Sequence, residues 1–115
     1  DAAIAHADSV DGHLRASYMD RLVAGMARGL AQARRGDGDA STAEFEQLRV
    51  AADATEDRVS QALVRLAAAA AASARGGDDA AALMAEADRR LDDLGLANTG
   101  WREAYSLALG LSPAT

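Results

Sequence analysis

The chain has no cysteine and no lysine, and among its 115 residues it has only one proline, one tryptophan, one phenylalanine and two tyrosines. Without cysteine, disulfides, zinc–thiolate sites and thiol catalysis are excluded. Residues that favour strands are also scarce, with one isoleucine and five valines. A membrane-spanning helix needs about 20 consecutive apolar residues. No run of that length occurs, so we expect no membrane insertion.

Alanine dominates the composition, with 31 residues. It has the highest helix propensity of all residues, so the composition predicts an all-α fold. Because alanine buries little apolar area, stability must come from close approach of helices. The length suits one domain, and we expect residues 1–115 to form a single helical domain. Residues 1–12 are expected to be a turn or two of helix or a loosely ordered lead-in.

The formal net charge is −6, and all twelve cationic side chains are arginines. Nucleic-acid affinity rests largely on cations that neutralise phosphates, so we expect no direct nucleic-acid binding. Abundant alanine, glycine and arginine without lysine indicate a high-GC, bacterial genome. The sequence starts at Asp1, which fits a processed or trimmed chain, and we favour a cytoplasmic location over export after signal-peptide removal.

The first long helix is predicted over residues 13–35, because large apolar residues recur there every four positions. These residues are Leu14, Tyr18, Leu22, Met26 and Leu30. Within the same segment Gly25 and Gly29 lie one turn apart, and each costs about 1 kcal/mol relative to alanine in a helix. We therefore expect another backbone to approach closely here, and the alanine-rich segment 67–72 is the expected partner.

A second helix is predicted over residues 42–74, opened by a capping box formed by Ser41 and Glu44. It carries a heptad seam, which is the spacing of residues that pack against another helix. The seam consists of Phe45, Leu48, Ala52, Thr55, Val59, Ala62, Leu66, Ala69 and Ser73. A continuous helix of this length would extend for about 50 Å at 1.5 Å per residue. The main alternative is a kink near residues 53–56.

Gly76 and Gly77 end that helix, and a third is predicted over residues 80–94 with Gly95 after its last residue. A fourth, short helix starts at residue 98 or 99 and carries Trp101 and Tyr105. Short connections favour antiparallel neighbours. The expected architecture is an up-and-down bundle of four main helices, one of them unusually long.

Signals for chemistry are weak. Residues 36–45 resemble the second half of a calcium-binding EF-hand loop, but the first and third ligand positions fall on Ala33 and Arg35 instead of carboxylates. We therefore expect no metal and no cofactor. No nucleophile motif or phosphate-binding loop occurs, so we expect no enzyme and no catalytic residues.

The sequence therefore favours a non-catalytic interaction or assembly module, either oligomeric or a small subunit of a larger complex. Its expected partner is another copy or another helical protein. The alternative is a carrier or sensor that binds a small apolar molecule or cofactor in the bundle core, lined by Met19, Met26, Met84 and Trp101. The candidate interface or pocket residues are Phe45, Leu48, Val59, Leu66, Gly25, Gly29, Met26, Trp101 and Tyr105.

Overall fold

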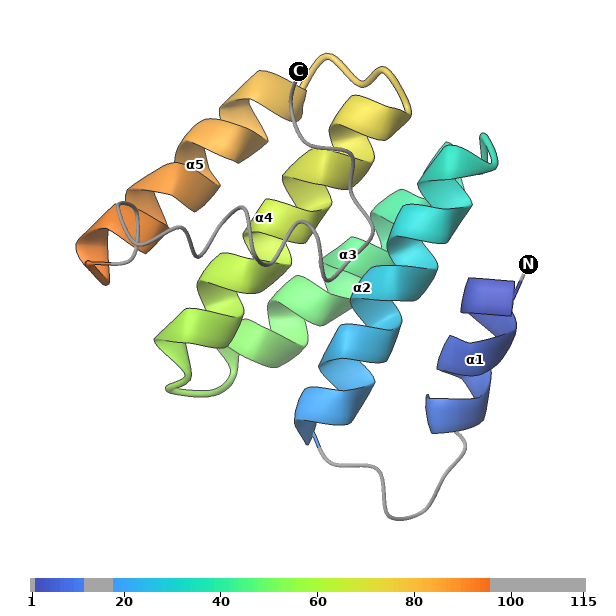
Figure 1. The fold of residues 1–115 in the computed structure, drawn as a ribbon. Helices are drawn as coiled ribbons and strands as arrows, with labels where there is room; N and C mark the ends of the chain where they lie inside the picture. The colour runs from blue at the N-terminus through green and yellow to red at the C-terminus, as the bar shows by residue number, and fades with distance from the viewer. Residues whose placement is uncertain (1, 12–17, 96–115) are drawn as a thin grey trace.

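The computed structural model describes residues 2–11 and 18–95, which form five helices (Figure 1). These helices are α1 (Ala2–Asp11), α2 (Tyr18–Arg34), α3 (Gly38–Asp53), α4 (Arg58–Ala74) and α5 (Ala80–Asp93). Successive helices run in opposite directions, so the described part of the chain is an all-helical, up-and-down arrangement (Figure 1). The predicted all-α fold is confirmed. The predicted helix from residue 98 and residues 13–17 of the first predicted helix lie outside the described residues.

The predicted continuous helix over 42–74 is wrong, because the chain turns back at residues 54–57 and separates α3 from α4. Side-chain hydrogen bonds hold this turn. The Thr55 hydroxyl donates to the carbonyl oxygen of Ala52 at 2.7 Å and accepts from the backbone N–H of Asp57 at 3.1 Å. The Asp57 carboxylate then accepts from the Ser60 backbone N–H and caps α4. The helix is therefore interrupted at the position of the predicted kink, and α3 and α4 are two separate helices.

The predicted capping box is also wrong, since α3 begins at Gly38, four residues before the predicted start at residue 42. Ser41 therefore lies within the helix, where its buried hydroxyl donates to the carbonyl oxygen of Gly29 at 2.8 Å. Glu44 accepts from Arg28 of α2 instead of reaching back to the backbone of Ser41. Both polar side chains of the expected cap thus link α3 to α2.

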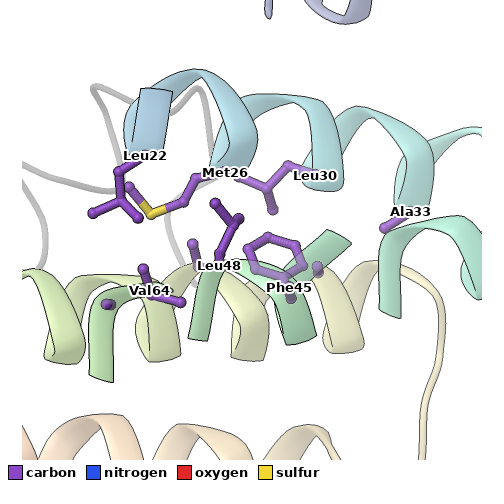
Figure 2. Close-up of a cluster of buried hydrophobic side chains, with 10 residues drawn as sticks. Leu22, Met26, Leu30, Ala33, Phe45, Leu48 and Val64 are labelled. Carbon is purple, nitrogen blue, oxygen red and sulfur yellow. The ribbon is translucent and has the colours of Figure 1, made fainter. Parts of the chain in front are cut away.

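The main core lies where α2 packs over α3 and α4, and Figure 2 shows the side chains of α2 facing those of the other two helices. Met26 and Leu30 of α2 are 1% and 2% exposed, and Val64 of α4 is fully buried. The complete buried set is Leu22, Met26, Leu30, Ala33, Phe45, Leu48, Ala52, Val64, Ala67 and Ala71. The four-residue apolar repeat of the first predicted helix therefore faces this core from Leu22 onward, whereas Tyr18 is exposed.

The two glycines of α2 make the close approach that was predicted, but with α3 and not with residues 67–72. A Cβ atom on Gly25 would lie 2.6 Å from Cδ2 of Leu48. A Cβ atom on Gly29 would lie 2.5 Å from Cε2 of Phe45. The heptad residues of α3 therefore occupy the space that the glycines leave open.

A second, smaller core joins α4 to α5. Ala62 and Leu66 of α4 pack against Ala87 and Leu91 of α5, and all four are at most 1% exposed. Helix α5 ends as predicted, with Gly95 at φ +74, a conformation that glycine adopts without strain. Among the described helices α5 packs only on α4, and α1 packs only on α2.

The N-terminal segment is helical in the structure and is not a loose lead-in. Ala7 of α1 is fully buried, and Asp8 accepts a 2.9 Å hydrogen bond from Arg28 of α2. The same guanidinium group also pairs with Glu44 of α3. One arginine therefore ties together three helices.

Candidate functional site

An apolar groove extends along α4, with α3 on one side and α5 on the other. Among the described helices α3 and α5 each pack on α4 but not on each other, so the face of α4 between them stays open. The groove has a volume of about 350 Å³. We call it the α4 groove, and it is lined by Ser41, Thr42, Phe45, Glu46, Arg49, Val64, Arg65, Ala68, Ala71, Arg75, Asp79, Leu83 and Glu86.

The base of the α4 groove is apolar and shallow, because the side chains that α4 presents there are alanines. Ala68 and Ala71 lie one turn apart on α4, between Val64 and Arg75. The eleven helical steps from Val64 to Arg75, at 1.5 Å each, make this segment about 16 Å long. Phe45 of α3 and Leu83 of α5 supply larger apolar groups at the sides. Of the apolar lining residues, Ala68 and Leu83 are half-buried, whereas Val64, Ala71 and Phe45 are buried beneath them.

Charged side chains form the rim of the α4 groove and pair with one another. Arg65 of α4 donates two hydrogen bonds to the carboxylate of Asp53, at 2.8 and 2.9 Å, which joins α4 to the end of α3. Arg49 bridges the same carboxylate, at 3.3 Å, to Glu46. At the other end Arg75 pairs with Asp79 at 3.2 Å. The rim is thus polar and neutral overall, as expected around an apolar binding surface.

These contacts favour the ionised carboxylates. The hydrogen bonds from Arg65 hold the pKa of Asp53 below its ordinary value against the opposing effect of burial, and the positive charges of Arg65, Arg90 and Arg49 add to this lowering. The hydrogen bond from Arg49 likewise lowers the pKa of Glu46. The rim therefore keeps its charges at neutral pH.

A second, polar cleft meets the α4 groove at Glu86, which lines both. It lies between the start of α4 and the last turns of α5, and its volume is about 320 Å³. We call it the arginine cleft, and it is lined by Arg58, Gln61, Glu86, Arg89, Arg90, Asp93 and Leu94. Three arginines thus face two carboxylates, which leaves one surplus positive charge in a chain whose net charge is −6.

The ion pairs of the arginine cleft are concentrated on one acid. Arg89 and Arg90 both pair with Glu86, the latter at 2.8 Å. Arg58, the first residue of α4, makes no ion pair within the part of the chain that the structure describes. An incoming anion would therefore meet an arginine whose charge is not already neutralised.

Most of the predicted site residues lie in the interior. Leu48, Leu66 and Met26 are 8%, 1% and 1% exposed, and Gly25 and Gly29 are buried against α3. Within this fold these five residues pack the two cores. Most of the heptad seam is therefore buried in the chain's own two cores and does not form one continuous external surface.

Phe45 is the exception among the buried seam residues, because it both contributes to the core and lines the α4 groove. Val59 is 37% exposed at the start of α4. Trp101 and Tyr105 lie outside the described residues. Of the methionines expected to line a central pocket, Met26 is buried, Met84 is half-buried and Met19 is 42% exposed, so the described helices do not gather them into one cavity.

Apart from Phe45, the residues of the α4 groove and the arginine cleft were not among the predicted site residues, although α4 carries a signal for them. Arg58, Arg65 and Arg75 flank its alanine run, and Arg65, Ala68 and Ala71 recur at helical spacing. This pattern describes a small-residue face bordered by cations. What the pattern lacks is any indication that α3 and α5 would leave that face open.

Neither a cluster of potential metal ligands nor a helix long and apolar enough to cross a membrane occurs among residues 2–11 and 18–95. Comparison with protein-family models, curated proteins and solved structures found no significant match to this chain.

Proposed function

We propose that the protein is a non-catalytic interaction module whose α4 groove receives an amphipathic helix of another protein. The observation that carries this proposal is an apolar groove about three helical turns long, left open because α3 and α5 do not pack on each other. Amphipathic helices bind such grooves through apolar residues spaced three and four apart.

The side-chain sizes in the groove support a helical occupant. The half-buried Ala68 allows the backbone of a partner to come close, with the buried Ala71 beneath it, while Phe45 and Leu83 provide apolar walls. Packed helices lie about 8 to 10 Å apart, and small residues at the contact favour the shorter distance. A partner helix seated there would contact α3, α4 and α5 together and complete a four-helix arrangement.

The proposal moves the interaction surface away from the heptad seam. Leu48 and Leu66 are buried in the two cores, so neither is free to meet a partner. Of the other seam residues, Phe45 is 7% exposed and lines the side of the α4 groove, and Val59 is exposed at the start of α4. The assembly role is retained, but its surface is the face of α4 that carries Ala68 and Ala71.

A library of displayed amphipathic helical peptides, selected against the full chain, tests this function. Binders that occupy the groove should lose at least about tenfold in affinity when Ala68→Trp fills the groove. The matched variant Ala85→Trp places the same side chain at an exposed position of α5 that does not line the groove, and it should bind normally. Circular dichroism and thermal unfolding verify that both variants fold. Equal binding by the two variants would refute the groove as the interaction site.

A small apolar ligand is the second candidate for the same groove. Its volume of about 350 Å³ lies within the range of about 300 to 1,000 Å³ that small-molecule sites occupy. A solvent-sensitive hydrophobic dye distinguishes the two functions. Tight, saturable dye binding that Ala68→Trp abolishes, together with failure to select any helical peptide, would favour the carrier.

A further inference from the structure

We infer that the arginine cleft orients the partner, so that the helix bound in the α4 groove carries carboxylates at the end that reaches Arg58 and Arg89. This inference rests on the proposed function and adds the charge and the direction of the partner. It follows from two observations: the cleft continues from the groove at Glu86, and it contains more arginines than carboxylates.

The α4 groove and the arginine cleft meet at Glu86 and together form one binding surface. This surface is apolar along the groove and charged at the cleft. The apolar part extends along α4 from Arg75 to Val64, and Glu86 marks the point where the polar part begins. At the far end Arg75 is already paired with Asp79. At the near end Arg58 has no ion pair among the described residues, and Arg89 shares the single carboxylate of Glu86 with Arg90. The surplus positive charge is therefore confined to the near end.

Arginine suits this role because its planar guanidinium group can donate two parallel hydrogen bonds to one carboxylate. The side chain of Arg89 is 68% exposed, and Arg58 is also exposed. Both can therefore reach a partner without breaking a buried contact. Charge pairs at the rim of an interface contribute more to specificity and association rate than to affinity. The cleft should thus select the direction of the helix while the groove supplies most of the binding.

Peptides selected on the full chain test the inference. We expect their acidic residues to gather at one end of the apolar stripe. The double variant Arg58→Glu, Arg89→Glu should weaken these peptides about tenfold at low salt and less at high salt, because the affected contacts are exposed. Replacing the terminal glutamates of the peptide with arginines should restore binding to the variant and weaken binding to the original chain.

The control is Arg21→Glu, Arg35→Glu, which makes the same change in net charge on exposed residues outside both features. It should leave the affinity within about twofold. Groove-dependent peptides with no charge preference, or equal losses in the two double variants, would overturn the orienting role and leave the proposed function intact. Failure to select any peptide that responds to Ala68→Trp would instead reject the proposed function.

Discussion

The hydroxyl of Ser41 donates a buried 2.8 Å hydrogen bond to the backbone carbonyl oxygen of Gly29, across the contact between α3 and α2. That carbonyl is reachable because Gly29 has no side chain and the ring of Phe45 lies where its Cβ atom would be. A polar and an apolar contact therefore depend on the same glycine. They hold the helix that forms one wall of the α4 groove.

Gly29→Ala should destabilise the fold by about 1 kcal/mol or more, even though alanine favours helix by about the same amount. The new Cβ atom would lie 2.5 Å from the rigid ring of Phe45, so α2 and α3 must separate. At Gly25 the obstacle is the flexible end of Leu48, so Gly25→Ala should cost less, and Gly25→Leu clearly more. Urea unfolding measures these differences.

Gly38→Ala is the matched control for the glycine series, because the nearest atom to its Cβ position is 3.5 Å away, at ordinary contact distance. It should be neutral or slightly stabilising. If Gly29→Ala proved as stable as Gly38→Ala, the close contact between α2 and α3 would be contradicted.

Asp57→Ala should lower stability by about 1 kcal/mol at pH 7, the usual effect of removing a helix N-cap. Hydrogen bonds from the hydroxyl and the backbone N–H of Ser60 lower the pKa of Asp57 in the folded state. A lowered pKa contributes stability above the unfolded-state value of about 3.9, and this stability is lost as the pH falls through the folded-state pKa. The difference in stability between Asp57→Ala and the original chain should therefore shrink below about pH 4.

Thermal unfolding from pH 7 to pH 2.5 checks this dependence. Asp92→Ala removes an exposed carboxylate near the end of α5 and should follow the original chain at every pH. A difference between Asp57→Ala and the original chain that stays constant down to the lowest pH would mean that the Ser60 hydrogen bonds do not depend on the ionised form.

Glu44→Leu should destabilise the protein by about 1 to 3 kcal/mol, because it leaves the guanidinium group of Arg28 largely buried without its main partner. The side chains of Arg28 and Glu44 are only 15% and 13% exposed. The double variant Arg28→Met, Glu44→Leu should recover much of the loss. Glu46→Gln, in an exposed pair with Arg49, should change stability little.

Denaturant unfolding of the original chain, Glu44→Leu, the double variant and Glu46→Gln measures these differences in stability. A double variant no more stable than Glu44→Leu would show that Arg28 contributes mainly through other contacts, such as its hydrogen bond to Asp8.

Periodicity predicted the helices well where one face of a helix meets one partner. The apolar repeat with Leu22, Met26 and Leu30 predicted α2 and its buried face, and the stripe from Ala80 with Gly95 after it predicted α5. In both cases local propensity and apolar spacing agree, and for α5 the terminating glycine agrees as well, so the sequence alone was sufficient.

The heptad seam wrongly predicted one long helix because its seven-residue spacing continues across the turn between α3 and α4. Ala52 and Leu66 are both buried, but Ala52 faces α2 whereas Leu66 faces α5. The turn of residues 54–57 preserves the register, so seven-residue spacing could not distinguish one long helix from two that fold back. The local evidence for the break was Asp57 followed three residues later by Ser60, an N-cap pair that the more regular seam obscured.

The α4 groove could not be predicted from the sequence, because it depends on which helices do not meet. Arg65 and Asp53 are 12 positions apart, and their pairing becomes apparent only when α3 and α4 lie side by side. The same is true of Arg58 and Arg89, which belong to different helices. The overall composition predicts an acidic chain and does not indicate the local excess of arginine in the arginine cleft.

Helix α1 packs only on α2 among the described helices, and it is fastened there by Ala7 and the contact between Asp8 and Arg28. Lifting it away would leave α2, α3, α4 and α5 in their mutual packing and would not touch either wall of the α4 groove. Its amide protons should therefore exchange with solvent independently of those in α4. Local opening of residues 2–11 is therefore expected to leave the α4 groove unchanged.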